Sequence, residues 1–202
     1  MILALLIDLD GVIRIWDPDI LANAEREARL PAGAIPRTAF HPDLLVPAIT
    51  GIVSDETWRH QVTEKLHEQF PEADGTMAVQ LWSKPSGKVH ADVLDLVRLC
   101  RRSAAVALIS NATSRLNADL TALGIQDEFD HIINTSEIGF AKPDQRAFDA
   151  ALTTAGVSPA EALFVDDSLT NVEAARTMGM RGHHFVSVDT LREEFVEAGL
   201  LK

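Results

Sequence analysis

Two pairs of aspartates, each directly after an apolar run, are the residues of this sequence best suited to chemistry. Asp8 and Asp10 follow the run 3–7, and Asp166 and Asp167 follow a second run. Such runs are typical of central parallel strands, whose carboxyl ends are where open α/β sheets bind ligands. Burying like charges together costs several kcal/mol unless a cation or a proton compensates. One pair alone is equally consistent with a solvated acidic turn. Two acidic strand ends in one sheet predict a divalent metal, for which Mg²⁺ is the best match, beside a nucleophilic or acid/base carboxylate.

Two further polar segments are expected at the same edge of the sheet. Ser110 and Asn111 follow the run 105–109 and precede a helical pattern, so their side chains and free backbone N–H groups are suited to an anion. Taken alone, these residue types are better explained by ordinary helix capping. Lys142 precedes Pro143, which excludes a helix interior, so we expect Lys142 in a turn from which it reaches across the site. A solvated surface lysine is the competing interpretation.

The order of strands, helices and glycines predicts a parallel sheet. Helical patterns end at Gly124, Gly156 and Gly179, each followed by an apolar residue, as in a helix C-cap. Strands that alternate with helices of this length imply right-handed crossovers. We therefore expect an α/β, Rossmann-like core of about five parallel strands with helices on both faces. The expected strands are Leu3–Ile7, Ala105–Ile109, His131–Ile133, Ala162–Val165 and His184–Val188.

The segment between the first strand and the rest breaks this alternation. It has helical patterns but no convincing strand, and a turn rich in proline, glycine and alanine at 31–36. The helical patterns lie at 18–30, 55–70 and 74–82. We expect an α/β core domain of residues 1–16 and 86–202, with a small all-helical domain of residues 17–85 inserted into it.

Composition excludes several classes of protein. The chain has 202 residues, of which 47% are hydrophobic, enough for a packed core. Its net charge of −12 argues against a nucleic-acid partner, because phosphate backbones are held by clustered lysine and arginine. The apolar runs are shorter than the roughly 18 residues that a membrane span needs, and the N-terminus does not resemble a signal peptide. We expect a cytoplasmic protein, a monomer or a homodimer, that binds neither membranes nor nucleic acid.

Other conspicuous side chains favour structural roles. The single cysteine, Cys100, lies in an apolar helical pattern and is expected to be buried and unreactive. Trp58 and Trp82 are expected in the core of the helical insert rather than as platforms for a substrate. Adjacent histidines on a strand point to opposite faces, so His183 and His184 are not expected to share a metal. After Asp10, Arg14 could meet an anionic group of a ligand, but a solvent-facing side chain is favoured, and Trp16 could contact the ligand as well.

Taken in order, these motifs resemble the haloacid dehalogenase-like (HAD) hydrolases. The closest likeness is to the phosphatase-type members with a helical cap inserted after the first motif, a pattern of subfamily IA. The resemblance covers nearly the whole chain. Residues 51–58 look like the cap segment of this subgroup, and 139–144 like the usual lead into the third motif. The four matching motifs are Asp8-Leu9-Asp10-Gly11-Val12, Ser110-Asn111, Lys142-Pro143-Asp144 and Asp166-Asp167.

The resemblance implies a Mg²⁺-dependent phosphomonoester hydrolase acting on a small phosphorylated metabolite, such as a sugar phosphate. Asp8 would be the nucleophile that forms an aspartyl-phosphate. Asp10 would protonate the leaving alcohol and then take a proton from water. Mg²⁺ would be held by Asp8, the backbone carbonyl of Asp10, Asp166 and Asp167.

The same resemblance assigns the phosphate-binding groups and leaves alternatives open. Ser110, the backbone N–H of Asn111 and Lys142 would hold the phosphoryl oxygens, and Lys142 would also neutralise the crowded carboxylates. A phosphomutase uses the same covalent intermediate and stays an alternative. A haloacid dehalogenase would need neither a metal nor the acid Asp10, and a non-catalytic binding domain would be expected to have lost a motif residue.

Overall fold

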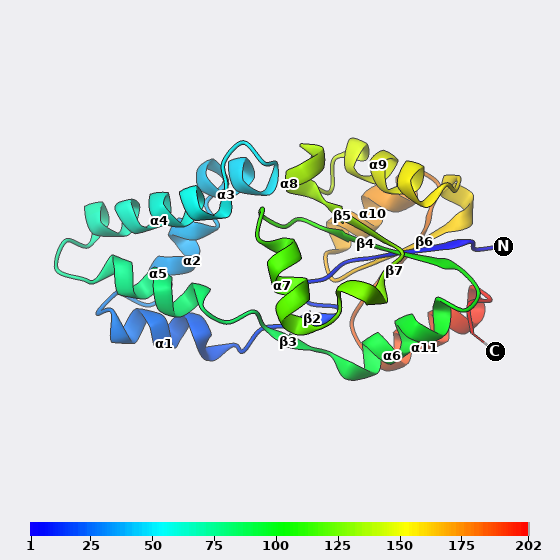
Figure 1. Ribbon diagram of the computed structural model, residues 1–202, viewed down its shortest axis with the longest axis horizontal. Coiled ribbons are helices and arrows are strands. Elements are labelled where there is room, and N and C mark those ends of the chain that lie inside the picture. Colours follow the sequence, from blue (N-terminus) through cyan, green and yellow to red (C-terminus); the bar gives the residue numbers. More distant parts are fainter. Residues whose placement is uncertain (202) are drawn as a thin grey trace.

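The computed structural model describes residues 1–201 and contains a parallel sheet with helices on both faces (Figure 1). The order of its strands is β5-β4-β1-β6-β7, and every neighbouring pair is parallel. This confirms the expected α/β, Rossmann-like core. The sheet strands are β1 (Ala4–Ile7), β4 (Ala105–Ser110), β5 (His131–Asn134), β6 (Ala162–Asp166) and β7 (Arg181–His184).

Two apolar layers enclose the sheet. In β1, Leu5 and Ile7 point to one face, where they pack with α6 and α11, and Leu6 points to the other, where it packs with α9 and α10. Because both faces are covered, β1 is fully buried, which is why it appears in the sequence as an unbroken apolar run. The helices of this part are α6 (Ala91–Cys100), α7 (Leu116–Leu123), α8 (Thr135–Ile138), α9 (Gln145–Ala155), α10 (Leu169–Thr177) and α11 (Val188–Glu197).

The remaining helices form a separate group at one end of the molecule (Figure 1). They enclose their own apolar cluster, which includes Trp58, Val62 and Leu66. A short antiparallel ribbon of β2 (Arg14–Ile15) and β3 (Lys88–Val89) connects this group to the sheet. We propose on this basis that residues 17–85 form a separate cap domain. Its helices are α1 (Asp19–Glu27), α2 (Ala34–Ala39), α3 (Pro42–Ile49), α4 (Asp55–Gln69) and α5 (Gly75–Ser83).

Three local predictions are wrong. The last strand is 181–184 rather than 184–188, and residues 185–187 lead directly into α11. β7 is an edge strand and only half buried, so its sequence contains no apolar run. The prediction placed the strand on the apolar residues that follow it. The turn expected at 31–36 ends early because α2 begins within it, and α3 was not predicted.

Helix ends are better predicted. Gly124 and Gly156 adopt the left-handed conformation at the C-caps of α7 and α9, as their positions indicated. Among the described residues no helix is both long and apolar enough to span a bilayer.

The buried cysteine gives a test of the packing. Cys100 has no exposed surface, and burial raises the pKa of its thiol to about 12. Because the thiolate is the reactive form, we expect alkylation by iodoacetamide at pH 8 to be negligible in the folded protein and fast in denaturant. Mass spectrometry of the alkylated protein measures this. Full labelling within minutes without denaturant would contradict the packing around α6.

Candidate active site

Parallel pairing brings the two acidic strand ends together. The register of β1 and β6 sets Ile7 opposite Val165, so Asp8 and Asp166 follow at the same edge of the sheet. The backbone N–H of Asp8 donates to the carbonyl of Val165 at 2.9 Å, which continues the ladder up to the site. Asp8 is 8% exposed and Asp166 is fully buried. The sequence-predicted aspartates therefore lie side by side below the surface.

Lys142 joins these two carboxylates. Its Nζ lies 2.9 Å from Asp8 Oδ1 and 2.7 Å from Asp166 Oδ2, and it donates to the carbonyl of Ile109 at 2.9 Å. The side chain is 1% exposed, which rules out a solvated surface lysine. Burial opposes its positive charge, but the two carboxylates outweigh that effect and raise its pKa, which favours the charged form of Lys142.

The side chain of Asn111 holds the Lys142 backbone in place. Its Oδ1 accepts from the N–H of Lys142 and its Nδ2 donates to the carbonyl of Lys142, both at 2.8 Å. The amide is therefore a positioning group for the lysine. Ser110 is buried at the end of β4, at the same edge. The expected helix directly after these residues is absent, because α7 begins only at Leu116.

The second acidic pair is held by residues that sequence reasoning did not assign to the site. Asn171 Nδ2 donates to both oxygens of Asp166, at 3.2 and 3.1 Å, and the N–H of Ser168 donates to Asp166 Oδ1 at 2.8 Å. His184 Nε2 lies 2.9 Å from the carbonyl of Asp167 and orients that segment. Asn171 follows the acidic pair on the first turn of α10, a spacing that could have indicated its role.

The carboxylates of Asp8, Asp166 and Asp167 are suited to a hard cation. Each offers an oxygen within 4.8 Å of the others. Burial, reinforced by the charge of Asp166, raises the pKa of Asp8 to about 7 although Lys142 opposes the shift. Burial and Asp166 likewise raise the pKa of Asp167. The negative charge of this cluster exceeds what Lys142 compensates, and clustered carboxylate oxygens are typical Mg²⁺ ligands. The residues present therefore fit this metal.

The backbone at Gly11 lies close to this cluster. A Cβ built on Gly11 would be only 2.0 Å from Asp167 Oδ2, and the residue has φ of +76°. Both observations require glycine here. The motif glycine after Asp10 thus gives Asp167 the room it needs at the edge of the sheet.

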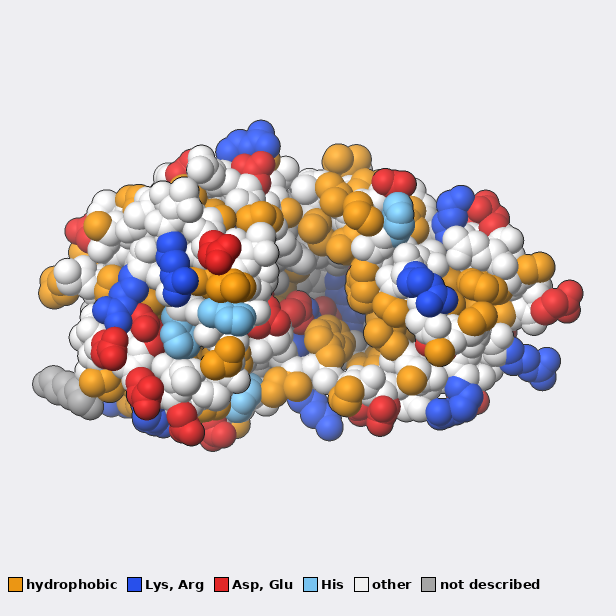
Figure 2. All heavy atoms as spheres, turned by 180° about the vertical axis from the view of Figure 1, so that it is seen from behind, with side chains coloured by type: hydrophobic (Ala, Val, Ile, Leu, Met, Phe, Trp, Pro, Cys, Tyr) orange, Lys and Arg blue, Asp and Glu red, His pale blue; other side chains and the backbone are white. Residues whose placement is uncertain are grey.

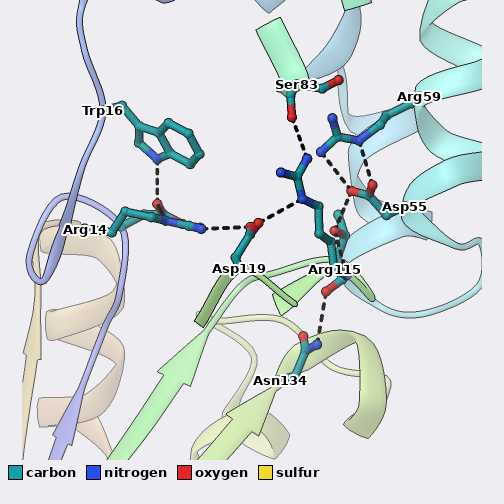
Figure 3. Close-up of polar contacts among 10 residues, drawn as sticks. Arg14, Trp16, Asp55, Arg59, Ser83, Arg115, Asp119 and Asn134 are labelled. Carbon is teal, nitrogen blue, oxygen red and sulfur yellow. Dashed lines mark hydrogen bonds and ion pairs between the residues drawn. The ribbon is translucent and has the colours of Figure 1, made fainter. Parts of the chain in front are cut away.

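The carboxylate of Asp10 turns toward two side chains that follow it. Arg14 Nε and Nη2 donate to its two oxygens at 2.7 and 2.8 Å, and Trp16 Nε1 donates to Oδ1 at 2.6 Å (Figure 3). Arg14 is 5% exposed, so the solvent-facing prediction is wrong. Its Nη1 reaches Asp119 at 2.9 Å, a partner distant in the sequence that local pattern could not reveal.

Polar contacts extend from this arginine to the helical insert (Figure 3). Arg115 Nε donates to Asp119 Oδ1 at 2.8 Å, and its Nη1 donates to the carbonyl of Ser83 at 2.6 Å. Thr113 Oγ1 donates to Asp55 Oδ1 at 2.7 Å. The insert is therefore fixed over the sheet edge by side chains from both parts.

Two cavities meet at Asp10 and Trp16. One of about 630 Å³ is lined by Asp8, Asp10, Trp16 and Asp167. The other, of about 480 Å³, lies between the insert and the sheet and also includes Asp10 and Trp16 in its wall. Seen from behind, the surface is hollowed between the two halves, with apolar side chains around the hollow and charged ones within it (Figure 2).

Comparison with known proteins decides the family. A family model described as haloacid dehalogenase-like hydrolase matches residues 2–179. The chain belongs to the haloacid dehalogenase-like hydrolase family. The resemblance of its four motifs is thereby confirmed at the level of the family.

Two relatives with different names are similar in sequence to this HAD hydrolase. It is 33% identical over 147 residues to haloacid dehalogenase-like hydrolase domain-containing protein 3 of Homo sapiens, covering 68% of this chain and 58% of that protein. It is 39% identical over 101 residues to phosphoserine phosphatase of Thermus thermophilus, covering 48% of this chain and 39% of that protein. The chain thus spans less than two thirds of the length of either relative.

Solved structures share the fold at low identity. A HAD family enzyme of Bacteroides thetaiotaomicron, in complex with magnesium and inorganic phosphate, has a TM-score of 0.73 at 22% identity and covers 91% of this chain and 93% of its own. L-2-haloacid dehalogenase of Xanthobacter autotrophicus has a TM-score of 0.67 at 20% identity, covering 100% of this chain and 85% of the dehalogenase chain. At such identities the likeness shows the HAD fold alone.

Proposed function

We propose that this chain is a Mg²⁺-dependent phosphatase that hydrolyses a small phosphomonoester through an aspartyl-phosphate on Asp8. The observation that carries the proposal is the buried contact of Lys142 with Asp8 and Asp166, beside Asp167. The similarity to a phosphoserine phosphatase supports the same reaction class. Asp8, Asp166, Asp167 and the backbone carbonyl of Asp10 would hold the metal, which, when bound, supplies positive charge to the phosphoryl oxygens.

The proposed reaction has two steps on the protein's own residues. A carboxylate oxygen of Asp8 attacks phosphorus, and the bond to the alcohol oxygen breaks as Asp10 donates a proton to it. Water then attacks the aspartyl-phosphate, Asp10 takes its proton, and inorganic phosphate leaves. Lys142 stabilises charge on the phosphoryl oxygens, with Ser110 and the backbone N–H of Asn111 beside it.

Asp10 must release Arg14 and Trp16 before it can act on a leaving oxygen. The three hydrogen bonds described above hold its carboxylate at the junction of the two cavities. The Asp10 side chain is 41% exposed, so it has room to rotate toward the catalytic cavity, at the cost of these three hydrogen bonds. Arg14 and Trp16 are thus proposed to hold the Asp10 side chain in this position between turnovers.

Changing Asp10 tests its acid/base role. We expect Asp10→Asn to accept phosphate from an ester with a good leaving group but to release it from Asp8 slowly, because no base activates water. Rapid-quench measurement with radiolabelled substrate should then find phosphorylated protein at steady state. If hydrolysis of alkyl phosphates proceeds at the wild-type rate in this variant, the role of Asp10 is refuted.

A second test addresses the metal and the reaction type. We expect phosphate release from a panel of phosphomonoesters to require Mg²⁺ and to stop in EDTA, because the carboxylate cluster then lacks its cation. Product analysis distinguishes a phosphomutase, which would return phosphate to a sugar hydroxyl. Release of halide from 2-haloacids in EDTA, without phosphate release in Mg²⁺, would support a dehalogenase instead.

A further inference from the structure

We propose that the substrate's organic group is apolar or aromatic and lies in the cavity between the helical insert and the sheet. This substrate class rests on the proposed phosphatase function. The cavity of about 480 Å³ is of the size that holds small-molecule ligands.

An aromatic cluster forms the wall that the insert contributes. Trp82 meets Phe40 and Trp58 edge to face, with ring centroids 5.9 and 5.4 Å apart. Phe40 is 46% exposed, although a ring of this size gains by burial. Aliphatic side chains of the insert continue this surface; they are Ile20, Leu21 and Leu45.

The charged groups of the wall are already paired with one another. Arg14 and Arg115 both bind Asp119, and Arg59 Nε donates to Asp55 Oδ2 at 2.6 Å. Among residues 1–201, every arginine of the cavity wall is therefore already paired with an aspartate, which weakens its attraction for a second anionic group of a substrate. The wall holds four aspartates and three arginines, an excess of negative charge that disfavours carboxylated or doubly phosphorylated substrates.

Three neutral polar groups of the wall are occupied as well. Thr113 donates to Asp55, the carbonyl of Ser83 accepts from Arg115, and the amide of Asn111 is bonded to the Lys142 backbone. A sugar hydroxyl could use these three groups only by breaking their contacts, at a cost in binding. An apolar group has no hydrogen bonds to lose in this cavity, and its transfer out of water is favourable.

The position of Asp10 connects this cavity with the chemistry. Asp10 and Trp16 belong to the walls of both cavities, so a substrate with its phosphate near Asp8 and its organic group among the aromatic rings crosses the boundary at Asp10. That boundary is where the leaving oxygen, and the acid that protonates it, must be.

Kinetics on esters of similar primary alcohols test the inference. We expect kcat/KM to be about 10- to 100-fold higher for 2-phenylethyl phosphate than for ethyl phosphate, because the ring is buried in the cavity. Glycerol 1-phosphate should be no better than ethyl phosphate. If ethyl and glycerol phosphates are hydrolysed as well as 2-phenylethyl phosphate, the phosphatase function holds and the apolar cavity is refuted as the substrate site.

Binding without turnover separates the two proposals. The chain has three tryptophans, Trp16, Trp58 and Trp82, and all of them line this cavity. We therefore expect 3-phenylpropylphosphonate, which cannot be hydrolysed, to change tryptophan fluorescence saturably, and 2-hydroxyethylphosphonate to bind at least about tenfold more weakly. This result without any phosphate release would refute the phosphatase function alone. Equal affinities, or no fluorescence change with either phosphonate, would overturn the inference.

A matched pair of variants on α5 locates the effect. Trp82→Ala should reduce the preference for 2-phenylethyl over ethyl phosphate about threefold to tenfold, because a ring of the aromatic wall is removed. Leu81→Ala is the control, since Leu81 is 41% exposed on the same helix and is not part of the cavity wall. An equal loss of preference in both variants, or none in Trp82→Ala, would contradict the proposed site.

Discussion

Replacing Asp8 by Asn is expected to reduce phosphate release by at least about a thousandfold while leaving the protein folded, because the covalent nucleophile is removed. The amide has the same shape as the carboxylate. It also takes a negative charge out of a buried cluster in which burial has raised the pKa of Asp8 to about 7. In buffer without metal, the midpoint of thermal unfolding should therefore be equal to or higher than that of the wild type.

Steady-state phosphate release and differential scanning fluorimetry measure the two effects. Asp43→Asn is a suitable control, because the side chain of Asp43 is 87% exposed on the insert. It should behave as the wild type in both assays. Near wild-type turnover in Asp8→Asn would refute the nucleophile, whereas a large loss of stability would show that the amide disturbs the fold and that the activity assay must be repeated with Asp8→Glu.

Replacing Lys142 by Met should have the largest combined effect on activity and stability. The substitution leaves Asp8 and Asp166 buried without their cation, which costs about 3 to 5 kcal/mol of unfolding free energy by analogy with broken buried ion pairs. It also removes a positive group from the proposed phosphoryl site, at a cost of about 100- to 1000-fold in kcat. Urea unfolding and phosphate release measure these changes.

Added Mg²⁺ gives this prediction a specific signature. Because a bound cation would supply the missing positive charge, Mg²⁺ should raise the unfolding midpoint of Lys142→Met more than that of the wild type. Lys65→Met is the control, since Lys65 is half exposed on α4 and its ion pair with Glu68 contributes little. A Lys142→Met protein as stable and as active as this control would contradict the site.

Local pattern was sufficient to predict the residues at the sheet edge. Asp8, Ser110 and Asp166 each end or follow a strand that is recognisable by itself, and parallel strands must end at one edge. Lys142 lies in the turn before α9, where Pro143 had indicated it. The prediction failed where burial is partial. The half-buried edge strand 181–184 has no apolar run, so its position could not be read from hydrophobicity.

Local pattern thus predicted the parallel sheet, the helices of the insert and the acidic strand ends, because the periodicity of apolar residues and the ends of strands are local properties of a chain. The family followed from the resemblance of the four motifs. The tertiary structure alone decided what Arg14 does, since its partner Asp119 is distant in the sequence. It likewise decided that the amide of Asn111 serves Lys142, and that Phe40 and Trp82 meet in one aromatic wall. Such pairings depend on which elements pack together, and packing is settled by the whole chain rather than by any segment of it.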